Sequence, residues 1–449
     1  MPSKSRGAPQ PLTIPKVREQ LSADGLLRTL RVGFQQIPDH RPSPDIPLRD
    51  ALMSAFALFS LKDPSLLAFD ERRADGNLLR VYGIGQVPSD TRLREILDPV
   101  DPAQLRPLFN DVFRSLQRGK ALEALVFHDN CYLLALDGTG YFSSPTIHCD
   151  SCLQKVSSQT GAVTYSHQML GAAIVHPDFR EVIPLAPEPI IKQDGVTKND
   201  CERNASKRLL RKVRQEHPHL GFIVIEDGLS SNAPHIHEIL DLNMHFILGA
   251  KPGDHVYLFQ QWIAAEDSGK ATTLVGTLPG GGTWEINFVQ ELLLNESSDL
   301  RVNFLQYGEY DQDGEVRKRF SWVTDLPLTA GVVLHLARGA RARWKIENET
   351  FNTLKNQGYQ FEHNFGHGKK NLSVVFAMLM MLAFLVDQTQ QLCCPLFRAV
   401  WHKCGSKRAL WEQQRSHFWC IALASMQQLY EVMLTDRAKE IPFPPLNSS

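Results

Sequence analysis

The sequence predicts an α/β fold that carries a β-rich insertion and is flanked by helical regions. Short apolar runs alternate with amphipathic helical stretches over residues 131–250, which is typical of a sheet covered by helices. Strand-like segments separated by Gly-rich or Asp/Ser-rich turns follow over residues 257–335, and these indicate the insertion. Apolar residues at helical spacing dominate both flanks.

The N-terminal flank is expected to hold an arm and then helices. Residues 1–43 are poor in apolar side chains and rich in proline and basic residues, so we expect a flexible or partly helical arm. Helical spacing over residues 46–125 predicts several helices, one of them capped by Ser89 or Asp90.

The α/β part begins with CYLLAL, a strand that we expect to end in a turn at residues 137–140. Two further strands are expected over residues 162–177 and 180–190. A helix capped by Asn199 or Asp200 comes next, then the strand GFIVIE, a helix from about Pro234, and the strand MHFILGA.

Residues 257–335 should contain five strands, which begin with WIAAED at residues 262–267. A helix is expected over residues 329–357, followed by a loop and two or three helices. The longest apolar run, residues 374–386, is shorter than the roughly 20 residues of a membrane span and predicts a buried helix. These patterns divide the chain into residues 1–125, 126–256, 257–335, 336–390 and 391–449.

Composition favours a cytoplasmic globular protein. Hydrophobic content is 43% and the formal net charge is −1, so binding to nucleic acid would depend on local patches. The polar N-terminus shows no secretory signal. Eight cysteines in 449 residues do not indicate a disulfide scaffold, which favours a reduced compartment.

Two acidic residues follow predicted buried strands. Asp137 comes after LLAL and Asp227 after IVIE, and sites in open α/β sheets form where strands end. Neighbouring carboxylates repel each other unless a cation lies between them, and Mg²⁺ prefers such oxygen ligands. Taken singly, either aspartate is more simply a turn residue.

A third carboxylate is available on the charged helix RARWKIENETFNTLKNQ, residues 341–357. Glu347 lies four residues after Arg343, so both share one helix face. Alone, this pair is typical of a solvated salt bridge. Together with two aspartates at strand ends, Glu347 could complete a two-metal site for attack at phosphorus.

The combination resembles the DDE transposases of bacterial insertion sequences, of the IS-four superfamily kind. The residues that carry the resemblance are LALDGTGYFSS around Asp137, FIVIEDGLSSN around Asp227 and RWKIENETFNTLKNQGY around Glu347. It covers roughly residues 80–390 and implies a ribonuclease H-like catalytic core with a β-rich insertion between the second Asp and the Glu. The 120 residues from Asp227 to Glu347 leave room for that insertion.

The resemblance implies that Asp137, Asp227 and Glu347 are catalytic and hold two Mg²⁺ or Mn²⁺ ions, which activate the nucleophile and stabilise the leaving oxygen. Arg343 and Lys355 would contact DNA phosphates. Ala340 stands where the family motif has tyrosine, and Lys355 follows the glutamate by eight residues where the motif often has seven. Cleavage at terminal inverted repeats and strand transfer into target DNA would be performed by a homodimer on paired ends.

Two alternatives within the same class of core are a metal-dependent nuclease that does not join strands and a catalytically inactive DNA-binding descendant. A structural protein with chance acidic residues is a third. Intact Asp137, Asp227 and Glu347 count against an inactive descendant.

Other motifs have simpler interpretations. Cys149 and Cys152 have C-x₂-C spacing but lack a second cysteine pair, so free thiols are favoured over zinc. His363 and His367 lie in a Gly-containing segment that favours a structural loop. Trp344 is expected to be packed rather than to stack on a base.

Basic stretches that could contact DNA are residues 4–31, the Arg92–Arg94 segment and the run KRLLRKVR at 207–214. The last is more simply the solvated face of an amphipathic helix.

Overall fold

A computed structural model of the chain describes residues 18–192 and 201–435. Its centre is one mixed sheet of 11 strands in the order β2-β3-β1-β6-β7-β11-β10-β9-β8, with β4 and β5 paired to β3. The predicted α/β class is confirmed. The strands are β1 (Cys131–Ser144), β2 (Leu153–Val156), β3 (Val163–Val175), β4 (Ile183–Pro184), β5 (Glu188–Ile190), β6 (Gly221–Glu226), β7 (His245–Gly249), β8 (Thr272–Thr277), β9 (Thr283–Leu293), β10 (Arg301–Tyr310) and β11 (Val316–Thr324).

Strand β1 is central and pairs with β3 in antiparallel and with β6 in parallel orientation. The last parallel pair along β1 and β6 is Ala135 with Ile225. Asp137 and Asp227 each lie two residues beyond that pair. Since side chains two apart along a strand share one face, the register brings both aspartates to the same level of neighbouring strands.

The inserted strands extend the main sheet. Strand β11 pairs with β7, with Val323 opposite Leu248, and β10, β9 and β8 follow as antiparallel neighbours. The four strands predicted over residues 271–326 are confirmed. The expected strand at residues 262–267 is wrong, because this segment ends helix α9 (Val256–Asp267). Helix α9 buries Leu258, Phe259, Trp262 and Ala265, a helical spacing that the short apolar run WIAA does not reveal.

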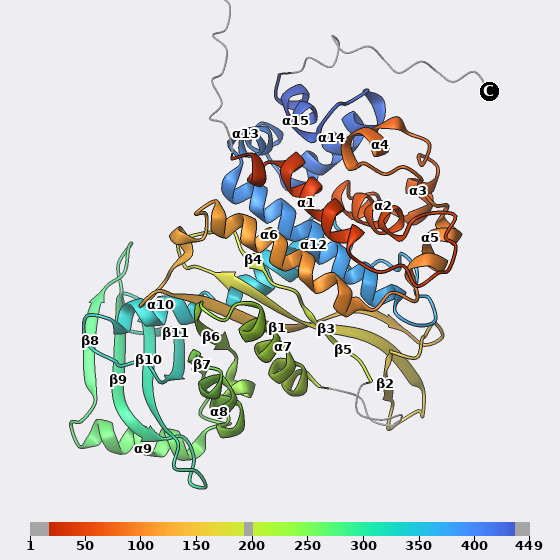
Figure 1. The fold of residues 1–449 in the computed structure, drawn as a ribbon. Coiled ribbons are helices and arrows are strands. Elements are labelled where there is room, and N and C mark those ends of the chain that lie inside the picture. Colours follow the sequence, from red (N-terminus) through yellow and green to blue (C-terminus); the bar gives the residue numbers. More distant parts are fainter. Residues whose placement is uncertain (1–17, 193–200, 436–449) are drawn as a thin grey trace, which may run out of the picture.

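Helices cover both faces of the sheet (Figure 1). Helices α7 and α8 lie below it in that view, and the helical bundle formed by the two ends of the chain lies above it. The helices of residues 18–125 are α1 (Ala23–Gln35), α2 (Leu48–Ser60), α3 (Leu66–Asp70), α4 (Gly76–Tyr82), α5 (Asp90–Leu97) and α6 (Arg106–Arg118), with short 3₁₀ turns η1 (Glu19–Leu21), η2 (Pro102–Leu105) and η3 (Glu123–Leu125). The later ones are α7 (Glu202–Glu216), η4 (Gly228–Ser230), α8 (Ala233–Asp241), α10 (Val333–Arg341), η5 (Ile346–Phe351), α11 (Asn352–Asn356), α12 (Leu372–Cys393), α13 (Pro395–Cys404), α14 (Lys407–Cys420) and α15 (Met426–Thr435).

Helix α12 is the core of the bundle. It contains the apolar run 374–386, and it has the length and hydropathy of a membrane span, yet 94% of its most apolar window is buried inside the protein. It contacts α2 and α6 as well as β4. The prediction of a buried helix is confirmed.

Three local predictions need correction. Strand β1 does not turn at residues 137–140 but continues to Ser144, because β3 pairs with it along that stretch. Of the expected flexible or partly helical arm, residues 18–43 are partly helical as predicted but packed rather than flexible, since α1 buries Leu26, Leu30 and Phe34 in the bundle. The helix expected over 329–357 is broken into α10, a turn, the π-helical turn η5 and α11.

Helix caps are predicted well where the capping residue is described. Ser89 accepts a hydrogen bond from the backbone of Arg92 at the start of α5. The sequence also predicts a capping region at Ser230, Ser231 and Asn232, and Asn232 accepts from the backbone of His235 at the start of α8. Asn199 and Asp200 lie outside the described residues, and the residue that precedes α7 is Cys201.

Candidate active site

The three predicted acids lie on three elements around the middle of the sheet. Asp137 is within β1, Asp227 directly follows β6, and Glu347 lies in the π-helical turn η5. Asp227 also performs the structural role expected of a turn residue, since its Oδ1 accepts a hydrogen bond from the Leu229 amide at 3.0 Å. Register, not a direct contact, places Asp227 level with Asp137.

Arg343 joins two of these carboxylates. Its Nη1 donates to Asp137 Oδ2 at 3.2 Å and to Glu347 Oε1 at 3.1 Å. The Arg343 side chain is only 13% exposed. The Arg343–Glu347 pair is therefore not an isolated surface salt bridge, because the same guanidinium also binds an acid on the central strand.

Asp137 is held in an environment that disfavours its charge. Burial raises the pKa of Asp137 to about 7, and the adjacent Glu347 carboxyl acts in the same direction, while Arg343 opposes both. One guanidinium thus offsets part of the repulsion between two close carboxylates. A divalent cation would offset more of it.

The packing of η5 against the sheet explains why Glu347 reaches Asp137. Gly171 on β3 pairs with Asp137, and a Cβ atom at Gly171 would lie 2.8 Å from Cζ of Phe351. The absence of a side chain there lets the Phe351 ring rest on the sheet. The turn that contains Glu347 is consequently seated beside Asp137. Single π-helical turns occur often at functional sites because they re-aim side chains.

A fourth carboxylate, Glu202, was not among the predicted site residues. It opens α7, and its Oε1 lies so close to Gly138 that a Cβ atom there would be 2.2 Å away. Burial raises the pKa of Glu202, and the negative charge of Asp227 raises it further. Glu202 therefore lies near both strand aspartates. The sequence shows only an acid in the first turn of a helix, and the helix dipole favours an acid at that place even where no site exists.

The donor set fits a hard divalent cation. Asp137, Asp227, Glu347 and Glu202 offer only carboxylate oxygens, which Mg²⁺ and Mn²⁺ prefer. Few protein ligands are needed, since Mg²⁺ keeps several waters and binds phosphate.

The two residues expected to contact phosphate differ in their surroundings. Arg343 lies within the acidic cluster. Lys355 on α11 forms an ion pair with Glu362 at 2.9 Å, so its link to the cluster remains a prediction.

Trp344 is not packed, and the expectation of a packing role is wrong. Its side chain is 47% exposed. The Arg343 guanidinium carbon lies 4.8 Å from the centroid of the ring. An exposed indole beside an acidic cluster is available for stacking on a base.

The other basic candidates are engaged in local pairs. On α7, Lys212 binds Glu188, and Arg211 binds Glu238. Arg92 pairs with Asp45, and Arg94 pairs with Asp90. The solvated-face interpretation of residues 207–214 holds for Arg211 but not for Arg208 and Lys212, because both bind the buried Glu188. Of the arm 4–31 only residues 18–31 are described.

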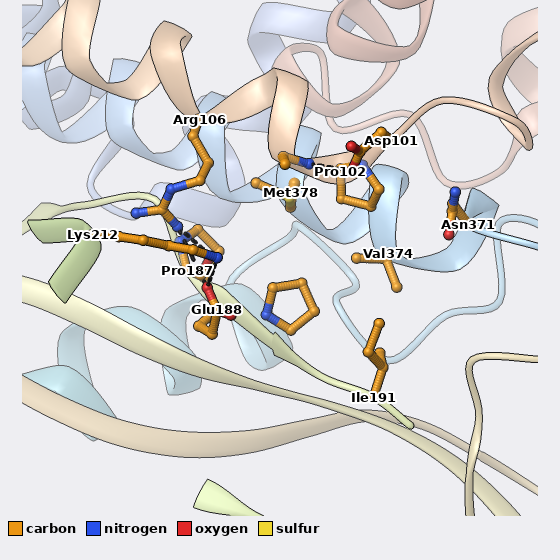
Figure 2. A pocket seen from close by; sticks show the side chains of 12 residues that line it. Asp101, Pro102, Arg106, Pro187, Glu188, Ile191, Lys212, Asn371, Val374 and Met378 are labelled. Atoms are coloured by element: carbon orange, nitrogen blue, oxygen red, sulfur yellow. Dashed lines mark hydrogen bonds and ion pairs between the residues drawn. The ribbon is translucent and has the colours of Figure 1, made fainter. Parts of the chain in front are cut away.

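A cavity of about 180 Å³ lies away from the three acids, between α12, the start of α6 and the segment of β5. Figure 2 shows Arg106 and Lys212 converging on Glu188 at one end of it. Arg106 also binds Glu216 through two nitrogens at 2.8 and 3.0 Å. The charged side chains of Arg106, Lys212 and Glu188 at this end of the cavity neutralise each other. The cavity is therefore better explained as part of the packing between helices and sheet.

Comparison of the sequence with known protein families and with characterised proteins finds no match for either.

Proposed function

We propose that this chain is a transposase that cuts DNA at terminal inverted repeats and joins the ends to target DNA by a DDE mechanism. The single observation that carries the proposal is the convergence of Asp137, Glu347 and Arg343 beside Asp227. These residues come from positions far apart in the sequence, yet they were selected together from the sequence pattern alone.

The sheet topology supports the proposal. In the order β3-β1-β6-β7, β3 is antiparallel to β1, β6 is parallel to β1, and β7 is parallel to β6, which is compatible with a ribonuclease H-like core. The second Asp follows β6, and the strands of the insertion separate it from the Glu. We assign residues 126–256 and 336–390 to the core and residues 257–335 to the insertion.

The residues of the site have distinct tasks in this proposal. Asp137, Asp227 and Glu347 hold two Mg²⁺ or Mn²⁺ ions, which when bound supply Lewis acidity for phosphoryl transfer. Arg343 keeps two of the carboxylates together and would contact a phosphate near the cut. Trp344 offers an exposed ring for a base next to the cleaved bond.

The partners follow from the reaction. Double-stranded DNA supplies both the ends and the target, and two ends brought together need two active sites, hence a homodimer in the DNA complex. We place the protein in the cytoplasm, where its DNA and reduced thiols would both be found.

The test uses purified protein and a DNA fragment that carries both sequences flanking its gene, with and without Mg²⁺. We expect Mg²⁺-dependent cleavage and strand joining by the unmodified chain, and neither reaction by Glu347→Gln. Glu349→Gln is the matched control, since Glu349 lies on the same turn but pairs with Arg180 instead.

Three outcomes separate this proposal from its competitors. Cleavage without joining would favour a nuclease, and DNA binding without cleavage under any divalent metal would favour an inactive descendant. Equal activity of Glu347→Gln and the unmodified chain would remove Glu347 from the site.

A further inference from the structure

A second cluster of potential metal ligands lies away from the acidic site. Cys149 and Cys152 come from the loop between β1 and β2, His167 from β3, and His367 from the loop before α12. All four side chains are buried, and their ligand atoms all lie within 4.8 Å of one another.

Four of the six distances between the ligand atoms are close to the edges of a tetrahedron around zinc. The two sulfurs are 3.8 Å apart, and Cys149 Sγ and Cys152 Sγ each lie 3.4 Å from His167 Nε2. Cys152 Sγ lies 3.3 Å from His367 Nε2. Zinc bonds of about 2.3 Å to sulfur and about 2.05 Å to nitrogen would separate ligands by about 3.8 Å and about 3.6 Å in a tetrahedron.

Ordinary core packing explains this cluster poorly. His167 is 0% exposed and His367 is 6% exposed. In each ring Nδ1 is buried with no hydrogen-bond partner among the described residues, so only Nε2 meets polar atoms. Those atoms are thiols, which are weak hydrogen-bond partners. Burying two imidazoles against thiols costs free energy, and a metal bound by the two Nε2 atoms and the two sulfurs would offset the part of that cost that arises at Nε2.

We propose that Cys149, Cys152, His167 and His367 form a structural zinc site. Two thiolates and two imidazoles select zinc over Mg²⁺. Four protein ligands fill the tetrahedron and leave no position for a substrate, which is the pattern of a structural site. The inference goes beyond the proposed function and does not depend on DNA cleavage.

The site revises the interpretation of C-x₂-C as free thiols. The second ligand pair consists of histidines, one of them 215 residues from Cys152, so no local spacing could reveal it. Residues 358–371 follow the helix that carries Glu347, and zinc would fasten this segment to the β1–β2 loop. Asp98 holds the other end of the segment by accepting hydrogen bonds from the amides of residues 369–372.

The first experiment measures zinc in the purified full-length protein by inductively coupled plasma mass spectrometry, after dialysis against metal-free buffer. We expect about one zinc per chain. Cys152→Ser and His367→Ala should each lose most of it. The matched controls are Cys420→Ser and His363→Ala, since both replaced residues are exposed, and both variants should retain the zinc.

A second measurement keeps the proposal testable if the ligand variants do not fold. Replacement of the bound metal by Co²⁺ in the unmodified protein should give thiolate-to-cobalt charge-transfer bands and the strong visible bands of a tetrahedral ion. The proposal would be overturned if the unmodified protein contains no zinc and also gives none of these bands with Co²⁺. A Cys149–Cys152 disulfide in protein kept under reducing conditions would also overturn it, as would full zinc retention by a folded Cys152→Ser variant.

Discussion

At the scale of single residues, Arg343 determines how the acidic cluster is held. Its guanidinium binds Asp137 and Glu347 at once, so two carboxylates that would repel each other are kept within reach of one cation. A surface pair of the same residue types, such as Arg180 with Glu349, joins only two groups. The pair Arg343 and Glu347, four residues apart, therefore has a role that spacing alone does not reveal.

Replacement of Arg343 by Ala should destabilise the protein when no divalent metal is added. The expected loss in free energy of unfolding is about 1–3 kcal/mol at pH 8, because charged hydrogen bonds are removed and two carboxylates are left facing each other. Added Mg²⁺ should recover more stability in Arg343→Ala than in the unmodified chain. Urea unfolding measures both effects. Arg180→Ala is the control, and equal losses in the two variants would contradict the role of Arg343.

Glu202 should tune metal binding without being indispensable. Because its carboxylate lies beside Gly138 and feels the charge of Asp227, Glu202→Gln should raise the Mg²⁺ concentration for half-maximal cleavage by about 10-fold. The maximal rate should change less than the Mg²⁺ requirement. An unchanged Mg²⁺ titration curve would show that Glu202 only stabilises the start of α7 and does not take part in metal binding.

At the scale of elements, the contact between η5 and β3 positions Glu347. The Phe351 ring rests on Gly171, which pairs with Asp137. Any side chain at Gly171 would separate the turn from the central strand. The geometry of the acidic cluster thus depends on a residue that carries no chemistry itself.

Gly171→Ala should reduce cleavage by displacing η5. The added Cβ would lie 2.8 Å from the Phe351 ring, and relief of that overlap should cost about 1–3 kcal/mol of stability. Gly140→Ala is the matched control, since its Cβ would meet no atom closer than 3.9 Å. Thermal unfolding and cleavage rates should both separate the two variants; wild-type activity in Gly171→Ala would show that the turn tolerates the shift.

The strands and helices also show which parts of the fold can be predicted from the sequence alone. Strands β3, β6 and β7 were predicted because each is a compact apolar run, and buried strands need little else to be recognised. Strand β1 was cut short because Gly138 and Gly140 favour a turn locally, whereas pairing with β3 is a tertiary effect. Helix α9 was missed because its apolar face is spread over a longer window than WIAA.

The sequence could predict only those site residues that belong to a recognisable local pattern. Asp137, Asp227 and Glu347 could be selected from strand ends and a charged helix. Glu202, His167 and His367 could not, since each joins its cluster through tertiary contacts. The exposure of Trp344 could not be predicted either, because it depends on which side of the helical segment packs against the sheet.

At the scale of the whole molecule, the helices of residues 18–125 and 372–435 form one bundle on one face of the sheet. Lys62 at the end of α2 forms a buried ion pair with Asp387 of α12, and its ammonium lies 3.8 Å from the Trp411 ring of α14. These contacts join residues more than 300 positions apart. The N-terminal and C-terminal helices of the bundle should therefore unfold together.

The pH dependence of global stability should include a contribution from His217, which packs against Phe113 of α6 with ring centroids 4.4 Å apart. Burial lowers its pKa to about 4, and nearby arginines add to the effect. Between pH 6.5 and 4 the unfolded chain binds a proton that the folded chain does not, so stability falls as pH falls through this window. The loss at pH 5 is about 2 kcal/mol.

His217→Phe should flatten the pH dependence while keeping the ring contact. Urea unfolding at pH 7 and pH 5 measures the difference. A variant that loses as much stability as the unmodified chain over this interval would show that His217 does not contribute.

The most direct test of the central claim is the rate of Mg²⁺-dependent cleavage at the DNA ends by Asp137→Asn, Asp227→Asn and Glu347→Gln. We predict that each single variant folds, binds the DNA and cleaves at least about 100-fold more slowly than the unmodified chain. Glu349→Gln should cleave at the unmodified rate. If any of the three variants cleaves as fast as the unmodified chain, the three carboxylates do not form one active site.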